Sequence, residues 1–200
     1  MKNIIMFSAG LVLTGVCGLV RPVPSMAGAP TEQIRMTVDR VVSILQDPRY
    51  SGNAKEPERR EQLRRAIYPR FDFEEMAKRS LGSHWRRRTP KEQAEFVALF
   101  TNLIKDSYVI SIESYRSDKV LYTREVQEGN YAEVGTVIIT NKGEEFSIAY
   151  RLHLVNRNWK VYDVVIENIS IVNNYRSQFG RVIARSSYGE LIRVMKDKQS

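Results

Sequence analysis

The sequence contains almost no cysteine and few of the residues from which catalytic or metal sites are built. Its single cysteine, Cys17, lies in an apolar stretch near the N-terminus, and only two histidines occur among 200 residues. A zinc site needs three or four clustered ligands, and the isolated His84 and His153 do not supply them. The sequence has no glycine-rich phosphate loop and no Gly-x-Ser-x-Gly nucleophile elbow. We therefore expect no metal, no cofactor and no catalytic residue.

Long apolar runs are scarce too, and the one that stands out is at the N-terminus. Lys2 precedes it, and the segment Ser-Met-Ala at 25–27 places small residues where a signal peptidase cleaves. We predict that residues 1–27 are a cleaved signal peptide and that 28–200 form a single domain. The alternatives are an uncleaved anchor, which the glycines within the run weaken, and lipid modification of Cys17. Cleavage would leave no thiol, so the domain would depend on its hydrophobic core.

The charge balance is basic, and most of the excess is concentrated in one region. Residues 55–92 contain twelve Lys and Arg against seven Asp and Glu, including the run Arg-Arg-Arg at 86–88. The region is either a solvated face of two helices or a docking surface for an acidic protein or, transiently, an anionic membrane. Nucleic acid is not an expected partner, because the aromatic residues do not interleave with Lys and Arg as a stacking platform requires.

Apolar periodicity divides the chain into helices, then strands, then helices. Helical spacing with start and stop signals predicts helices at 31–46, 57–68, 72–81 and 89–114. The sequence Thr-Pro-Lys-Glu at 89–92 is a capping box with proline at the first helical position, and Asp72 with Glu75 forms a second one. Alternating segments separated by short polar turns predict strands at 119–127, 131–140, 145–155 and 159–172.

Two helical pieces, 175–186 and 188–196, end the chain. This order of elements predicts an α+β fold in which helices pack on one face of a curved antiparallel sheet of four strands or slightly more. A curved sheet beneath a long helix can form a cone-like enclosure with an apolar interior. The long and aromatic residues expected inside are equally compatible with an ordinary solid core.

Two long segments carry a resemblance to a known family. They are 159–179, which reads WKVYDVVIENISIVNNYRSQF, and 71–85, which reads FDFEEMAKRSLGSHW before the long helix. Together they resemble the MlaC or toluene-tolerance family, over roughly residues 32–197. Many members have glycine where this chain has Asn168, a residue type that also tolerates positive φ. The resemblance implies a periplasmic phospholipid-binding protein of the ABC transport system that maintains outer-membrane lipid asymmetry.

The resemblance also favours a cavity that holds acyl chains over a solid core. The candidate ligand-binding residues, drawn from the long helix, the central strands and the start of the last helices, are Phe100, Tyr108, Val134, Ile138, Ile148, Tyr150, Leu152, Tyr162, Val164, Ile166, Tyr175 and Arg176. Arg176 could bind a headgroup phosphate, since guanidinium binds phosphate through two hydrogen bonds. It could equally satisfy carbonyl groups at the end of a strand.

The predicted function is therefore a carrier that encloses acyl chains and shuttles phospholipid between membranes. The resemblance implies two partners, an inner-membrane ABC transporter complex and an outer-membrane lipoprotein complex. One alternative is a cone-fold periplasmic enzyme that uses Asp163 with Tyr150 or His153. The other is a non-catalytic adaptor with a solid core.

Overall fold

The computed structural model describes residues 29–114, 117–140 and 142–198, with the side chains of 106–118 left out. The predicted signal peptide, 1–27, lies outside the described residues. The six helices of the described ranges are α1 (Ala29–Gln46), α2 (Glu56–Ile67), α3 (Phe73–Leu81), α4 (Pro90–Ser114), α5 (Ile171–Arg185) and α6 (Tyr188–Asp197). The five strands are β1 (Ser117–Glu128), β2 (Tyr131–Thr140), β3 (Glu145–Val155), β4 (Asn158–Ile166) and β5 (Ile169–Ser170). The predicted α+β class is confirmed.

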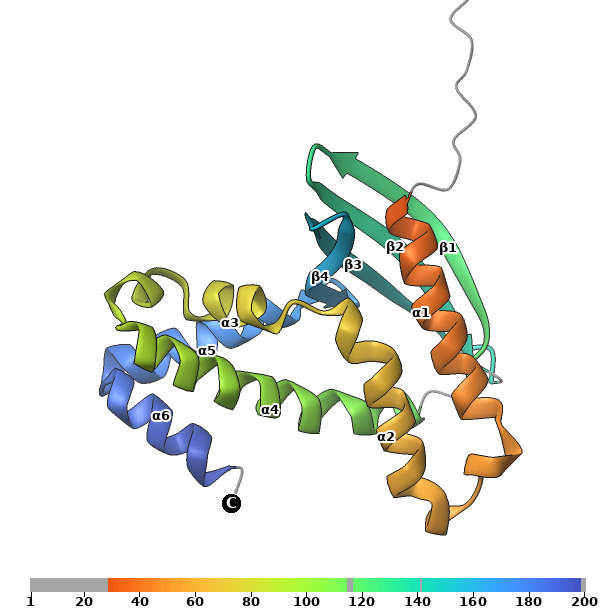
Figure 1. Ribbon diagram of the computed structural model, residues 1–200, viewed down its shortest axis with the longest axis horizontal. Helices are drawn as coiled ribbons and strands as arrows, with labels where there is room; N and C mark the ends of the chain where they lie inside the picture. Colours follow the sequence, from red (N-terminus) through yellow and green to blue (C-terminus); the bar gives the residue numbers. More distant parts are fainter. Residues whose placement is uncertain (1–28, 115–116, 141, 199–200) are drawn as a thin grey trace, which may run out of the picture.

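The strands form one antiparallel sheet in the order β1-β2-β3-β4-β5, so each strand pairs with its neighbour in sequence. The sheet curves without closing, and helices cover its concave side, which we call the inner face (Figure 1). The opposite side is the outer face. Helix α1 lies across the inner face, while α3, α4, α5 and α6 form a helical layer that extends away from the sheet (Figure 1).

The fourth strand is shorter than predicted. It ends at Ile166, and Glu167 and Asn168 then adopt positive φ values of 47° and 66°. This turn sends the chain back so that Ile169 pairs with Ile166 in the short strand β5. Ser170 caps α5 by accepting a hydrogen bond from the Asn173 amide, so the helix begins four residues before the predicted start at position 175. Asn168 thus adopts a positive φ, which its residue type tolerates.

Both predicted capping boxes start helices. The Thr89 amide donates to Glu92 Oε2 over 2.7 Å, and the Glu92 amide donates to Thr89 Oγ1 over 3.3 Å, which satisfies two amides at the start of α4. At α3, the Asp72 carboxylate accepts from the Glu75 amide over 2.9 Å. The Asp72 amide instead donates to the Val161 carbonyl on β4, which ties the start of α3 to the edge of the sheet.

The first half of α1 is fastened to strands that are distant in sequence. The Thr31 amide donates to Glu125 Oε2 on β1 over 2.9 Å, and the Trp159 amide on β4 donates to Gln33 Oε1 over 3.0 Å. Ile34 is buried in the same core cluster as residues of the inner face. Helix α1 therefore spans the sheet from one edge strand to the fourth.

Aromatic residues hold the helical layer together. Phe96 and Phe100 of α4 are fully buried, and Phe179 of α5 meets both rings edge-on, with centroids 5.6 and 6.3 Å away. Tyr175 of α5 also packs edge-on against Phe100 at 5.8 Å. None of the helices within the described ranges is long and apolar enough to cross a membrane.

Candidate ligand-binding cavity

A cavity of about 210 Å³ lies between the inner face of the sheet and the helices α1, α2 and α4. Its wall is apolar apart from a few polar side chains. The described residues that line it are Thr37, Val38, Val41, Val42, Leu45, Ile67, Tyr68, Phe71, Phe73, Met76, Ile104, Lys105, Val120, Ile138, Ile148, Tyr150, Val164, Ile166 and Ile171. An enclosure of this composition favours an apolar ligand or an apolar part of one.

The strand register explains how the sheet supplies its share of the wall. Ile148 on β3 pairs with Ile166 on β4, and Tyr150 pairs with Val164. Residues two apart on a strand share a face, so these four side chains point to the inner face together. Ile138 joins them from β2. All five are among the predicted ligand-binding residues, and the structure brings them together on the cavity wall.

Two further predicted residues, Val134 and Leu152, share the inner face but are not on the wall. Both are completely buried, in the core cluster that also contains Ile34 of α1. The inner face is therefore divided along the strands. One part is solid core beneath the start of α1, and the other part opens into the cavity.

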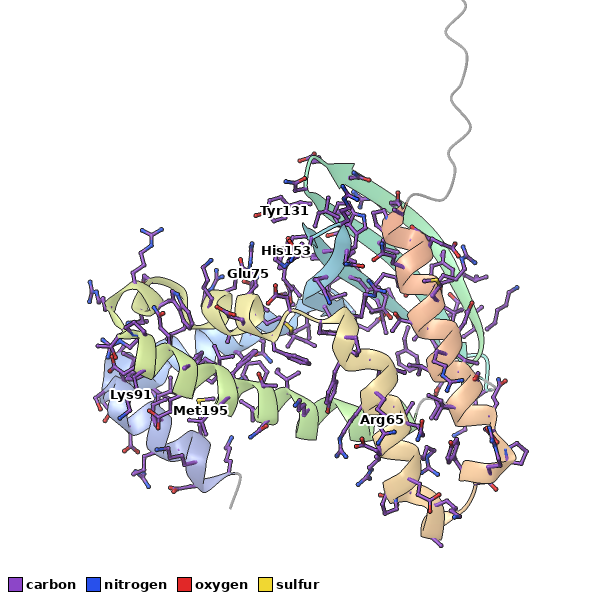
Figure 2. All side chains as sticks on the ribbon, in the orientation of Figure 1. Arg65, Glu75, Lys91, Tyr131, His153 and Met195 are labelled. Atoms are coloured by element: carbon purple, nitrogen blue, oxygen red, sulfur yellow. The ribbon has the colours of Figure 1, made fainter. Side chains whose placement is uncertain are left out.

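Tyr162 was predicted to point inward, and this is wrong. The register passes from Arg151 opposite Asp163 to Leu152 opposite Val161, so Tyr162 is an extra residue in a bulge. Its ring packs on the outer face, edge-on to His153 at 5.6 Å. The Arg79 guanidinium lies 4.0 Å above the Tyr162 ring. Figure 2 shows His153 and Tyr131 on this side of the sheet, away from α1.

Three predicted residues belong to the helical layer and are not on the wall. Phe100 and Tyr175 pack against each other in the aromatic core. Arg176 Nε donates to the Arg79 carbonyl over 2.8 Å, and its aliphatic stem lies against Gly82. Arg176 thus has a structural role, but the carbonyl that it satisfies lies near the end of helix α3 and not at the end of a strand. The side chain of Tyr108, the remaining predicted residue, lies outside those described.

The helical half of the wall was not predicted from the sequence. Val38, Val41 and Leu45 lie at helical spacing on the apolar face of α1, but nothing in the sequence indicates which part of that face meets a cavity. Phe71 and Phe73 flank the capping residue of α3, and their rings stack at 5.8 Å. The sequence gives no signal that the chain before α3 turns these rings toward the sheet.

Two polar side chains on the wall carry no charge: the Tyr150 hydroxyl is protonated, and the Thr37 hydroxyl is hydrogen-bonded. Burial raises the pKa of Tyr150 to about 12, so its hydroxyl stays protonated at physiological pH. Thr37 donates to the Gln33 carbonyl and accepts from Arg70 Nε. Lys105 is the exception, because its ammonium group lies over the Tyr68 ring, 4.6 Å from the centroid.

The hydrogen bonds of Asp163 do not involve Tyr150 or His153, its partners in the enzyme alternative. Asp163 faces the outer side, where Ser170 Oγ, the Val172 amide and Arg151 Nη1 donate to it over 2.7, 3.0 and 3.2 Å. Tyr150 points to the inner face, as its neighbour Val164 does. The hydrogen bonds that Asp163 accepts from Ser170 and Val172 fasten the turn between β4 and α5 to the sheet.

His153 of that alternative is bonded elsewhere. Its Nε2 lies 2.9 Å from Asp72 Oδ2, at the start of α3. Within the described ranges, no group of three or more His, Cys, Asp or Glu side chains could hold a metal ion.

The basic region, 55–92, is largely paired within its own helices. Ion pairs along α2, α3 and the start of α4 join Lys55 to Glu58, Arg60 to Glu56, Arg64 and Arg65 to Glu61, Lys78 and Arg79 to Glu75, and Arg88 to Glu92. Arg88 also lies 4.5 Å above the Tyr188 ring. Arg86, Arg87 and Lys91 remain exposed at the far end of the helical layer, where no described acid pairs with them; Figure 2 labels Lys91 there. Any docking role for the region therefore narrows to this end.

The family model described as MlaC protein matches residues 35–197, most of the chain. The chain belongs to the MlaC family. The predicted resemblance is confirmed, over nearly the range that the two sequence segments indicated.

Two individual proteins are also similar to this MlaC-family chain. The intermembrane phospholipid transport system binding protein MlaC of Haemophilus influenzae is 23% identical over 162 residues, which cover 78% of this chain and 72% of that protein. The toluene tolerance protein ttg2D of Pseudomonas putida is 24% identical over 126 residues, covering 62% of this chain and 59% of that one.

A solved structure has the same fold as this MlaC-family chain. A phospholipid-binding protein from Ralstonia solanacearum, solved in complex with a phospholipid, superposes with a TM-score of 0.72 at 26% identity. The match covers 83% of this chain and 94% of that one.

Proposed function

We propose that this protein is a periplasmic carrier that holds phospholipid acyl chains in the cavity between α1, α2, α4 and the sheet. The observation that carries the proposal is the apolar wall of that cavity. The Ralstonia solanacearum protein, which has the same fold and was solved with a phospholipid, supports it. In this proposal residues 1–27 are removed on export, and 28–200 are the lipid-binding domain.

The size of the cavity indicates how a lipid is held. A cavity of about 150 Å³ is large enough to bind benzene, so about 210 Å³ gives room for part of an acyl chain. A whole diacyl lipid needs more space. The first half of α1 is fastened to β1 and β4, so we propose that the second half of α1 and the helix α2 move outward as the chains enter.

Transfer between membranes requires contact with partners. A diacyl lipid has about 30 methylene groups worth about 0.8 kcal/mol each, so desorption into water costs on the order of 20 kcal/mol. The carrier must therefore exchange lipid while docked. We propose an inner-membrane ABC transporter complex and an outer-membrane lipoprotein complex as its partners. The name of the Haemophilus influenzae relative, which includes an intermembrane phospholipid transport system, supports this assignment.

Neither alternative accounts for the geometry as well. An enzyme would need Asp163 beside Tyr150 or His153, but Asp163 and Tyr150 point to opposite faces, and the Asp163 oxygens already accept three hydrogen bonds. An adaptor with a solid core would not need an apolar cavity. The carrier proposal needs only an enclosure and a means of exchange.

The proposal is tested by extracting the purified exported protein with organic solvent and by native mass spectrometry. We expect phospholipid to co-purify, close to one molecule per protein. Protein that is folded, empty and unable to take up phospholipid from vesicles would contradict the carrier. Turnover of a substrate that disappears in His153→Ala would favour the enzyme instead.

A further inference from the structure

Lys105 is the one formally charged side chain among the described residues that line the cavity. It follows the buried Ile104 on α4 and is itself half-buried. Its ammonium nitrogen lies 4.6 Å from the centre of the Tyr68 ring and 6.0 Å from that of Phe73. Both rings also line the cavity, so the positive charge is held against the apolar wall.

The described residues compensate the ammonium group of Lys105 only in part. Removing a charge from water is unfavourable unless an opposite charge or hydrogen bonds replace the water. The faces of Tyr68 and Phe73 attract the cation, but no carboxylate among the described residues forms an ion pair with Lys105. An anion that enters with the ligand would complete the site.

Neighbouring cations are already engaged by the fold. Arg70 donates from Nη1 to the Trp159 carbonyl and to Gln33 Oε1, and from Nε to Thr37 Oγ1. These bonds join α1 to β4, so Arg70 is a structural link. Its partners on these bonds are neutral, and burial lowers its pKa. Among the described residues that line the cavity, Lys105 is therefore the one cation left to meet a ligand.

We propose that Lys105 binds the phosphate of the lipid headgroup, which rests on the carrier function proposed above and adds the orientation of its ligand. A phosphodiester offers anionic oxygens to an ammonium group through charge-assisted hydrogen bonds. The attached acyl chains match the apolar wall supplied by the sheet. The headgroup lies beside α4 and Tyr68, and the chains extend between α1 and the inner face. Lys105 thereby gives the carrier a preference for lipids that carry a phosphate.

The test compares two lipids that differ in the phosphate. Delipidated protein is incubated with vesicles that contain equal fractions of phosphatidylglycerol and diacylglycerol with identical acyl chains, and the bound lipids are quantified by mass spectrometry after gel filtration. In Lys105→Met the bound ratio of phosphatidylglycerol to diacylglycerol should fall about tenfold, the effect of losing one charge-assisted hydrogen bond. Lys105→Arg should keep the preference. Lys142→Met is the control, because Lys142 lies exposed in the turn between β2 and β3 and is not on the cavity wall.

The outcomes separate this inference from the carrier function. A reduced ratio in Lys105→Met alone, with total bound lipid maintained by diacylglycerol, supports the phosphate site. An unchanged ratio, or an equal fall in Lys142→Met, overturns it and leaves the carrier intact. Wild-type protein that binds neither lipid overturns the carrier function and the phosphate site together.

Discussion

Filling the cavity with a side chain should separate lipid binding from folding. Ile148 is the position of choice, because it lies in the middle strand of the cavity wall, between Thr136 on β2 and Ile166 on β4. Ile148→Trp adds an indole ring to the space that an acyl chain would occupy. The matched control is Ile169→Trp, since Ile169 is 63% exposed and lies outside the wall.

The structure gives the expected magnitudes. An empty cavity destabilises a core by about 24 cal/mol per Å³, so about 210 Å³ corresponds to about 5 kcal/mol that a ligand or a filling side chain can partly recover. Overpacking costs about 1–3 kcal/mol. These two effects oppose each other. Without lipid, the free energy of unfolding of Ile148→Trp should therefore be within about 2 kcal/mol of that of the wild type.

Lipid should then distinguish the two proteins. At a free concentration 100 times the Kd, a ligand stabilises the folded state by about 2.7 kcal/mol. For a chain of this size, that raises the Tm by about 5–10 °C. Wild type and Ile169→Trp should show this increase, and Ile148→Trp should show little of it.

Thermal unfolding followed by circular dichroism, with and without phospholipid vesicles, measures the shift, and native mass spectrometry measures bound lipid. A folded Ile148→Trp protein that binds phospholipid as the wild type does would refute the assignment of this face to the ligand. Loss of folding in Ile148→Trp would be seen in the lipid-free spectrum before any lipid is added.

Three other changes test the remaining elements. Asp163→Asn should lower the free energy of unfolding in urea by about 2 kcal/mol, because it weakens hydrogen bonds to a buried carboxylate, while lipid content stays unchanged. The double reversal Arg86→Glu and Arg87→Glu should slow association with anionic vesicles about tenfold at low salt. The control Arg65→Glu, in which the changed residue is ion-paired on α2, should not slow it. If the double reversal and the wild type associate at the same rate, the exposed cations at this end of the helical layer are only a solvated face. Hydrogen bonds from Thr89 lower the pKa of Glu92, so its stabilising effect is present above its ordinary value of 4.5 and is lost as pH falls through the lower folded value. The difference in Tm between wild type and Glu92→Gln should therefore shrink from pH 7 to pH 3, and a constant difference would contradict this.

Features that depend on nearby residues could be predicted from the sequence. Thr89 and Glu92 are three residues apart, and their mutual hydrogen bonds follow from that spacing. The order of the strands also follows from short turns, because a chain that reverses within two to four residues pairs each strand with the next. The family resemblance adds the expectation of a cavity.

Features that depend on distant partners could not be predicted. The alternation of Tyr162, Val164 and Ile166 continues smoothly in the sequence, and only the register against β3 reveals that Tyr162 is bulged to the outer face. Asparagine tolerates positive φ, so the residue type of Asn168 is compatible with the turn. Glu167 also has positive φ, but its residue type does not indicate this.

The long helix shows the same limit. Phe100 and Ile104 lie one turn apart on one apolar stripe of α4, yet Phe100 packs on α5 while Ile104 lines the cavity. A helix of 25 residues extends about 37 Å, so its two ends meet different neighbours. The periodicity identifies the buried stripe and does not say what covers each part of it.

The fastening of α1 has a consequence for the order in which the molecule folds. The sheet needs only pairings between consecutive strands, whereas the bonds of α1 join residues that are 94 and 126 positions apart. Contacts between distant positions form slowly, because a long loop must close first. Helix α1 is synthesised before the strands that it meets, yet it should dock after they have paired. The concave face is therefore complete, and still uncovered, at a late stage of folding.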